Sequence, residues 1–208
     1  MPRPNRAALR WARRRAGAVA GLRGRRTAWG GGPRRRGAPV VTSLKAFLLA
    51  LQMMESSGDY RLVNSLNYLG AYQFGEAALV DLGYVRPDGN LLDNDYGGGW
   101  TGKDGIDSRR EFLRSRSAQD RAAEAWLVVM WGYVTRLGLD RYAGQRVGDV
   151  VLTPSGMLGA THLLGPHALA EFIASDGTAD LRDPYGTPIE TYIRQLAGYD
   201  LPFAVPQD

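Results

Sequence analysis

Apolar residues recur after residue 43 at the spacing of one helix face. They are Leu44, Phe47, Leu48, Leu51 and Met54. Ser43 stands just before them and can cap the first turn, because its hydroxyl oxygen accepts a backbone N–H there. The pattern predicts a helix over 44–55 that ends at the turn-forming run 56–58.

Five further segments carry helix signals, over 76–82, 118–137, 154–164, 168–175 and 188–197. Ser117 with Asp120 suggests a capped start for the second of them. We predict that this segment is the central buried helix, with an apolar stripe formed by Ala122, Ala125, Trp126, Val129, Met130 and Tyr133. Proline at 154 and 188 suits the first turn of a helix, where its missing N–H costs nothing.

No segment alternates apolar and polar residues over any length, as a half-buried strand would. The predicted class is therefore mainly α (α+β), with at most a small β element, expected near 60–75. Residues 85–107 contain six glycines and Trp100 and predict a long loop. Loops of this length in a compact domain are usually functional or mobile.

The composition of the 208 residues suits one soluble globular domain, with 44% hydrophobic and 23% charged residues. The chain has no cysteine, which excludes disulfides, thiolate catalysis and cysteine-ligated metals. No run approaches the ~18 apolar residues of a membrane span, so no transmembrane segment is expected.

The net charge of +5 is unevenly distributed. Residues 1–39 hold twelve arginines and no acidic residue, which leaves 14 basic and 21 acidic residues after them, a net charge of −7. We therefore expect a disordered, Arg-rich arm over 1–40 and a folded domain over 41–208 that does not bind nucleic acid. The arm could contact phosphates or an anionic surface, or be a solvated tail or a stretch upstream of the true start.

Two motifs lie close together in the first third of the domain. The first is Glu55-Ser56-Ser57-Gly58, and Gly70-Ala71-Tyr72-Gln73-Phe74 begins fifteen residues after Glu55. Together they resemble the soluble lytic transglycosylases (SLT-type), peptidoglycan-cleaving enzymes of the lysozyme-like superfamily, in a bacterial or phage-associated branch. A third family motif, Ala-Tyr-Asn-Ala-Gly-Pro, has a diverged counterpart at 160–166.

The resemblance runs from 43 to 199 and implies a lysozyme-like helical domain with Glu55 as its catalytic acid. Tyr72 stands where the family usually has Met, and His162 where it usually has a Tyr that hydrogen-bonds the catalytic Glu. The expected substrate-binding residues are Ser56, Tyr72, Gln73, Phe74, Trp100 and His162. Each has a structural alternative, such as a polar turn for Gln73, a satisfied core group for His162 and packing for Trp100.

The position of Glu55 suits this chemistry. It follows Leu51 by four residues and so continues the apolar stripe, where burial favours a protonated carboxyl group. Cleavage of a β-1,4 glycosidic bond needs such an acid. Lytic transglycosylases use one Glu as acid and then base, whereas a muramidase would normally have a second carboxylate, for which the candidates are Asp59, Asp93, Asp95 and Asp107.

We expect a glycosidase that cuts between N-acetylmuramic acid and N-acetylglucosamine in peptidoglycan, either a lytic transglycosylase or a muramidase. A chitinase-like specificity is a variant of this hypothesis. The expected location is the cell envelope or a phage-like particle. The alternative is a non-catalytic, lysozyme-like binding or structural module, whose Arg-rich arm contacts nucleic acid or an anionic surface.

No cofactor or metal is expected. Asp93-Asn94-Asp95 hints at calcium but lacks the remaining ligand positions and the closing Glu of a calcium loop. His162 and His167 are the only histidines, too few for a His-based zinc site. Gly97-Gly98-Gly99 lacks the Lys-Ser/Thr that follows in a phosphate-binding loop.

Overall fold

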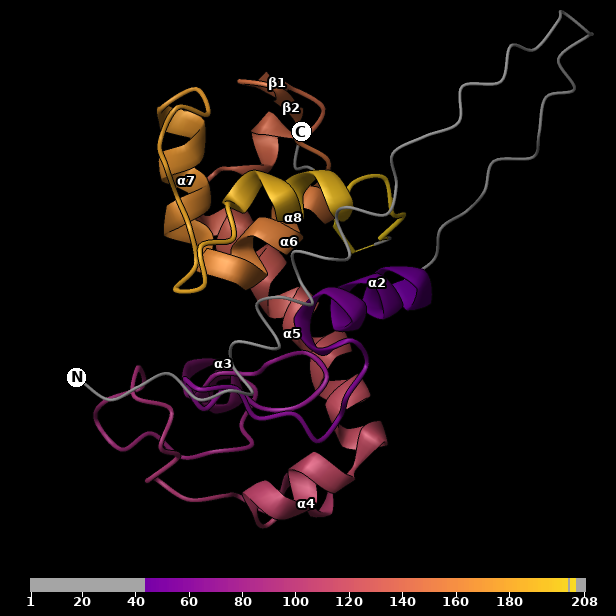
Figure 1. Cartoon of the computed structure of the whole chain (residues 1–208), viewed down its shortest axis with the longest axis vertical. Coiled ribbons are helices and arrows are strands. Elements are labelled where there is room, and N and C mark those ends of the chain that lie inside the picture. The colour runs from indigo at the N-terminus through magenta and orange to yellow at the C-terminus, as the bar shows by residue number, and fades with distance from the viewer. Residues whose placement is uncertain (1–43, 202, 205–208) are drawn as a thin grey trace, which may run out of the picture. The chain divides into compact units, whose positions relative to one another are not determined.

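A computed structural model describes residues 44–201 and 203–204, which belong to one compact unit spanning Thr42–Asp208 (Figure 1). The predicted arm over 1–40 and the predicted cap at Ser43 lie outside the described residues. Within them no helix has the length and hydrophobicity needed to cross a membrane.

The described residues are mainly helical, as the sequence predicts. Their α-helices are α2 (Leu44–Ser56), α3 (Glu76–Asp81), α4 (Arg109–Arg114), α5 (Arg116–Arg136), α6 (Pro154–Leu164), α7 (Pro166–Ala174) and α8 (Ile189–Gln195). Two 3-10 turns, Lys103–Gly105 and Asp140–Tyr142, and the strands β1 (Arg146–Val147) and β2 (Val150–Val151) complete the structure. The sequence did not predict α4 or the strands.

The helix starts follow local side-chain chemistry. Thr153 caps α6 by accepting the N–H of Gly156, with Pro154 in the first turn, as expected. The predicted cap of α5 at Ser117 is wrong. Ser115 caps this helix instead, accepting the N–H of Ala118, so Ser117 already lies inside the first turn.

The small β element lies elsewhere than predicted. β1 and β2 form an antiparallel hairpin in which Arg146 pairs with Val151 and Val147 with Val150. The segment 60–75, where the sheet was expected, contains only isolated bridges centred on Leu69. Strands of two residues are too short to produce an alternating pattern, which explains why the sequence did not reveal them.

The long helix α5 supports the rest of the domain. It contacts α4, α6 and α7, and α6 in turn packs against α7 and α8 (Figure 1). The predicted stripe on α5 is partly wrong, since Ala125 is exposed. The buried residues of α5 are Ala118, Gln119, Ala122, Ala123, Leu127, Met130, Trp131 and Val134. Residues 126–134 are apolar on several sides, so periodicity alone does not fix the buried face.

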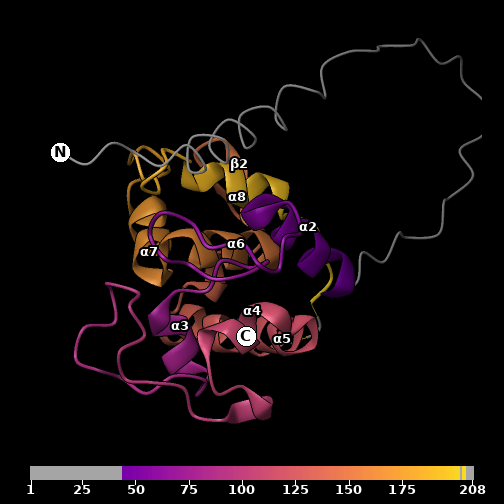
Figure 2. The same cartoon turned by 60° about the horizontal axis from the view of Figure 1, so that its bottom comes forward.

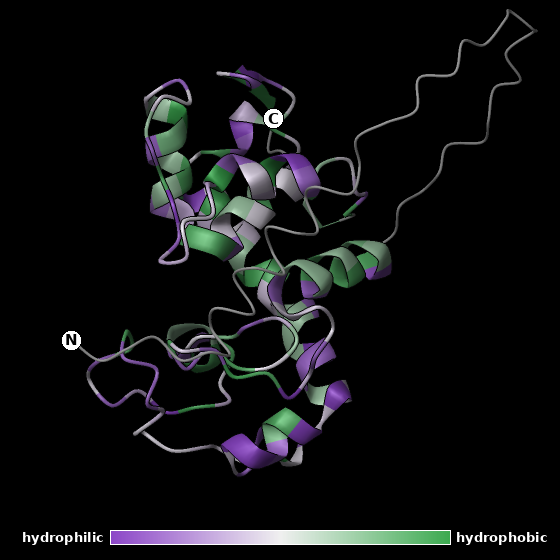
Figure 3. Ribbon diagram, viewed as in Figure 1, coloured by the Kyte–Doolittle hydropathy of each residue, from purple (hydrophilic) through white to green (hydrophobic). Residues whose placement is uncertain are grey.

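The helix α2 lies beside α8 in both views (Figures 1 and 2). Phe47 of α2 packs edge-on against the ring of Tyr199, which follows α8, with ring centroids 5.5 Å apart. Phe47, Leu48 and Leu51 are buried, which confirms the predicted apolar face of this helix. Figure 3 shows hydrophobic residues along α2 and hydrophilic residues along much of α4. The burial of these three residues fixes the end of α2 inside the domain.

Candidate functional site

Glu55 occupies the last turn of α2 on the buried side of the helix. The residue is 5% exposed, in line with the expectation that it continues the apolar stripe. Charged residues are rarely buried unless they are paired, so the partners of this carboxyl group decide its chemistry.

Two side chains from the C-terminal helices meet the Glu55 carboxyl group. The hydroxyl of Tyr192, on α8, donates a hydrogen bond to Oε1 of Glu55. Nε2 of His162, on α6, lies 3.8 Å from the same oxygen and 3.0 Å from the carbonyl oxygen of Tyr72. Because a carbonyl only accepts, Nε2 carries the hydrogen in this contact. The structure thus places His162 beside Glu55 and adds Tyr192.

The first four residues of the second motif, Gly70-Ala71-Tyr72-Gln73 (Gly-x-x-Gln), form a tight turn next to the end of α2. The hydroxyl of Ser56 donates to the carbonyl of Ala71 at 2.8 Å and so joins α2 to this turn. Gln73 adopts a positive φ of 50°, and its Nε2 donates to the carbonyl of Gly70 at 2.7 Å. Oε1 of Gln73 is buried and has no hydrogen-bond partner among the described residues.

Two polar residues of α5, Gln119 and Asp120, make hydrogen bonds to residues of this turn. Oε1 of Gln119 accepts the N–H of Ala71 at 2.9 Å, and a Cβ atom at Gly70 would lie only 2.0 Å from that oxygen, so glycine is required there. Asp120 accepts hydrogen bonds from the hydroxyls of Tyr60 and Tyr72 at 2.7 and 2.8 Å. Burial and the Asp120 hydrogen bond raise the pKa of both tyrosines, which keeps them as donors.

The other predicted substrate-binding residues pack in the interior. Tyr72 and Phe74 are each 1% exposed, with ring centroids 6.0 Å apart. Trp100 is partly buried, stacks on Tyr96 and contacts Phe112. These contacts assign packing to the three rings, and stacking of Trp100 on a sugar stays a prediction.

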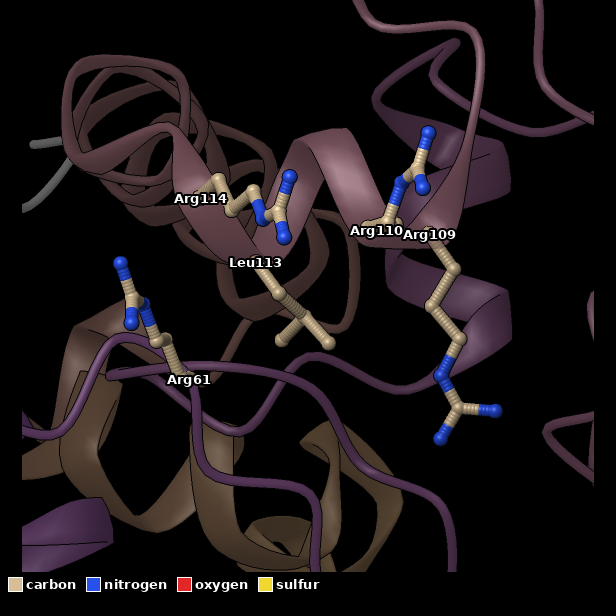
Figure 4. A pocket seen from close by; sticks show the side chains of 5 residues that line it. All are labelled: Arg61, Arg109, Arg110, Leu113 and Arg114. Carbon is tan, nitrogen blue, oxygen red and sulfur yellow. The ribbon is translucent and has the colours of Figure 1, made fainter.

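A pocket of about 460 Å³ lies at α4 (Figure 4). Its lining residues are Arg61, Arg109, Arg110, Leu113 and Arg114. No salt bridge involves these arginines within the described part of the chain. Neither Glu55 nor any predicted substrate-binding residue lines it. The pocket is a basic feature of a domain whose net charge is negative.

One group of carboxylates among the described residues could hold a metal ion. It consists of Glu76, Asp88, Asp93 and Asp95. The sequence pattern brought Asp93 and Asp95 together, but nothing in it connected them with Glu76 or Asp88. The group comes from α3 and the loop that follows α3, and it includes none of the residues around Glu55.

Tyr192, Gln119 and Asp120 are the main features of the site that sequence reasoning missed as site residues. In the sequence, Tyr192 is only one of the apolar positions in the last predicted helix (188–197), and Asp120 is only part of a capping pattern. No local signal connects any of them with Glu55. Comparison of the chain with protein-family models, with curated proteins and with solved structures found no match.

Proposed function

We propose that the protein cleaves the β-1,4 bond between N-acetylmuramic acid and N-acetylglucosamine in peptidoglycan, with Glu55 as general acid and base. The observation that carries this proposal is the buried Glu55 carboxyl group, which meets Tyr192 and His162 beside the turn 70–73. A carboxyl group can act as the acid that protonates a leaving oxygen.

The hydrogen bonds suggest which oxygen of Glu55 carries the proton. Oε1 accepts the hydroxyl hydrogen of Tyr192, and we therefore propose that Oε2 carries the proton that is transferred. Oε2 would give it to the glycosidic oxygen as the C1–O bond breaks. The carboxylate left behind would then take a proton from the nucleophile that attacks C1.

The nucleophile distinguishes the two outcomes of the proposed reaction. In a lytic transglycosylase it is the 6-hydroxyl of the muramic sugar, assisted by its acetamido group, and the product is a 1,6-anhydro sugar. In a muramidase it is water, and the product is a reducing end. We favour the transglycosylase, because Glu55 can then serve alone with groups that the substrate brings.

The hydrogen bond from Tyr192 to Glu55 fits the hypothesis drawn from the motifs, although the tyrosine lies on an unexpected helix. His162 stands where the family resemblance leads us to expect a tyrosine that hydrogen-bonds the catalytic glutamate. In this chain a tyrosine hydroxyl makes that hydrogen bond from α8 instead, and His162 lies on the other partner helix, α6. We propose that Tyr192 orients the Glu55 carboxyl group and that His162 fixes the turn 70–73 through the Tyr72 carbonyl.

The test is to incubate purified sacculi with the full chain and with its Glu55→Gln variant, and to identify released products by mass. Glutamine can still accept the Tyr192 hydrogen bond but cannot donate an acid proton, so we expect release to fall about 10²–10⁴-fold. Glu171→Gln, which changes an exposed carboxylate on α7, is the matched control and should keep full activity.

Equal release by wild type and Glu55→Gln would refute Glu55 as the acid. No release by the folded wild type would favour the alternative, a non-catalytic module. Terminal 1,6-anhydro sugars would identify a transglycosylase and reducing ends a hydrolase, which also resolves the chemical class of the nucleophile.

A further inference from the structure

Four carboxylates converge where α3 begins and the loop after it folds back. One oxygen each of Glu76, Asp88, Asp93 and Asp95 lies within 4.8 Å of the others. The three aspartates are exposed, whereas Glu76 is 0% exposed. Four negative charges at this spacing repel one another, so a positive charge is needed to offset the repulsion.

The backbone holds these residues in place through specific hydrogen bonds. Oδ1 of Asn94 accepts the N–H of Glu76 at 2.8 Å, and Oε2 of Glu76 accepts the N–H of Tyr96 at 2.9 Å. Oδ1 of Asp95 accepts the N–H of Gly97 at 2.7 Å. A Cβ atom at Gly97 would lie 2.8 Å from Oδ2 of Asp88 and 2.9 Å from Oδ1 of Asp95, so a side chain at this position would make both carboxylates shift.

A second observation points to a ligand. Oε1 of Glu76 is buried and has no hydrogen-bond donor among residues 44–201 and 203–204. A buried carboxylate oxygen without a partner is costly, and the described residues place no lysine or arginine in a salt bridge with any of the four acids. The Glu76 carboxyl group nevertheless faces the three aspartates, where a cation would complete its coordination.

We propose that Glu76, Asp88, Asp93 and Asp95 bind a calcium ion. All the donors are carboxylate oxygens, which hard cations prefer. Two oxygens that share Ca²⁺ at about 2.3–2.6 Å can be up to about 5 Å apart, whereas two that share Mg²⁺ at about 2.0–2.1 Å are at most about 4 Å apart. The spacing of the group accommodates the larger ion.

The fold supplies what the loop sequence lacks. Asp93-Asn94-Asp95 alone misses the remaining ligand positions of a calcium loop, including a glutamate. Glu76 provides that glutamate from α3, and Asp88 provides a third aspartate from earlier in the same loop. The bound ion would fasten 88–95 to the start of α3.

A proton is the competing way to relieve the repulsion. Burial raises the pKa of Glu76, and the charges of Asp88 and Asp95 raise it further. A protonated Glu76 could share its hydrogen with a neighbouring aspartate. The test must therefore separate a cation from a proton.

The test uses the full chain after treatment with a chelator, followed by addition of Ca²⁺. At about 100 times Kd the melting temperature should rise by roughly 5–10 °C. Terbium(III), which takes calcium sites, should luminesce when the protein is excited, because Tyr96 donates its N–H to Glu76 and stacks on Trp100. Ca²⁺ should displace it.

Asp88→Asn and Asp95→Asn each remove one charge and keep an oxygen that can accept the backbone N–H of Asn90 or Gly97. Both variants should lose most of the calcium-induced shift and of the terbium signal. Asp149→Asn, an exposed aspartate of the hairpin, is the matched control and should respond as the wild type does.

A melting temperature that Ca²⁺ does not change overturns the proposal, and so does an equal shift in Asp88→Asn, Asp95→Asn and wild type. A melting temperature that is insensitive to Ca²⁺ but rises as the pH falls would assign the site to a shared proton. None of these readouts depends on glycan cleavage, so the calcium site and the proposed function fail or stand separately.

Discussion

The contact between Tyr192 and Glu55 offers a way to measure the protonation state that the proposed chemistry requires. Tyr192→Phe keeps the buried ring, which is 1% exposed, and removes only the hydroxyl that donates to Oε1. A hydrogen bond between neutral groups contributes about 1 kcal/mol to stability, and one to a charged acceptor about 1.5–3 kcal/mol. The size of the loss therefore reports on the acceptor.

The assay is urea unfolding of four proteins near neutral pH: wild type, Tyr192→Phe, Glu55→Gln and the double variant. In the Glu55→Gln background the acceptor is neutral, so the change at 192 should cost about 1 kcal/mol. If Glu55 is protonated at rest, as a general acid must be, the cost in the wild-type background is also about 1 kcal/mol. Tyr68→Phe, at an exposed ring, should change the free energy of unfolding by less than about 0.5 kcal/mol.

Two results would refute this reasoning at different points. A cost of about 2–3 kcal/mol in the wild-type background, with about 1 kcal/mol in the Glu55→Gln background, would identify a resting carboxylate and exclude Glu55 as a preformed acid. If Tyr192→Phe unfolds at the same urea concentration as Tyr68→Phe, the hydrogen bond contributes nothing, and Tyr192 does not position Glu55.

Two further predictions concern the surface. Burial, the hydrogen bond to Asp81 and the charge of Asp81 raise the pKa of Tyr133 to about 12. The stability that protonated Tyr133 contributes is therefore complete below pH 10 and is lost between pH 10 and about 12. The melting temperature of Tyr133→Phe should fall less steeply than that of wild type over this pH range, and parallel declines would contradict the assignment. Arg114→Gln, in the basic pocket, should reduce the amount of protein that co-sediments with acidic sacculi and make this binding less dependent on salt. Arg146→Gln removes the same charge from the hairpin and should leave the binding unchanged. Equal losses in the two variants would show an effect of net charge only.

Much of the helical architecture could be predicted from local signals. The apolar stripe of α2 and the Thr153-Pro154 start of α6 depend on neighbours in sequence, and the structure confirms the two helices that they mark. The register of α5 could not be predicted in the same way. Its apolar residues surround the helix, and the packing of α4 and α6 against it decides which are buried.

The candidate site divides along the same line. Glu55 and the turn 70–73 could be singled out because each belongs to a short motif of neighbouring residues. The sugar-lining roles predicted for Tyr72 and Phe74 came from the same motif, yet their side chains point into the core and make aromatic contacts there. A motif predicts the path of the backbone more reliably than it predicts what each side chain contacts.

Tyr192 and the acidic group show why long-range chemistry escapes sequence reasoning. Tyr192 is 137 residues from Glu55, and its position on α8 follows the apolar spacing of an ordinary core residue. Likewise, Asp93-Asn94-Asp95 lacks ligands as long as only its own loop is considered, because Glu76 belongs to the preceding helix. Both arrangements depend on two elements folding together, and in both the proposal rests on a buried glutamate. The sequence alone could name one of these glutamates, Glu55, because a motif surrounds it. Glu76 is distinguished only in the folded chain, by its burial and by an oxygen that has no hydrogen-bond partner among the residues that the structure describes.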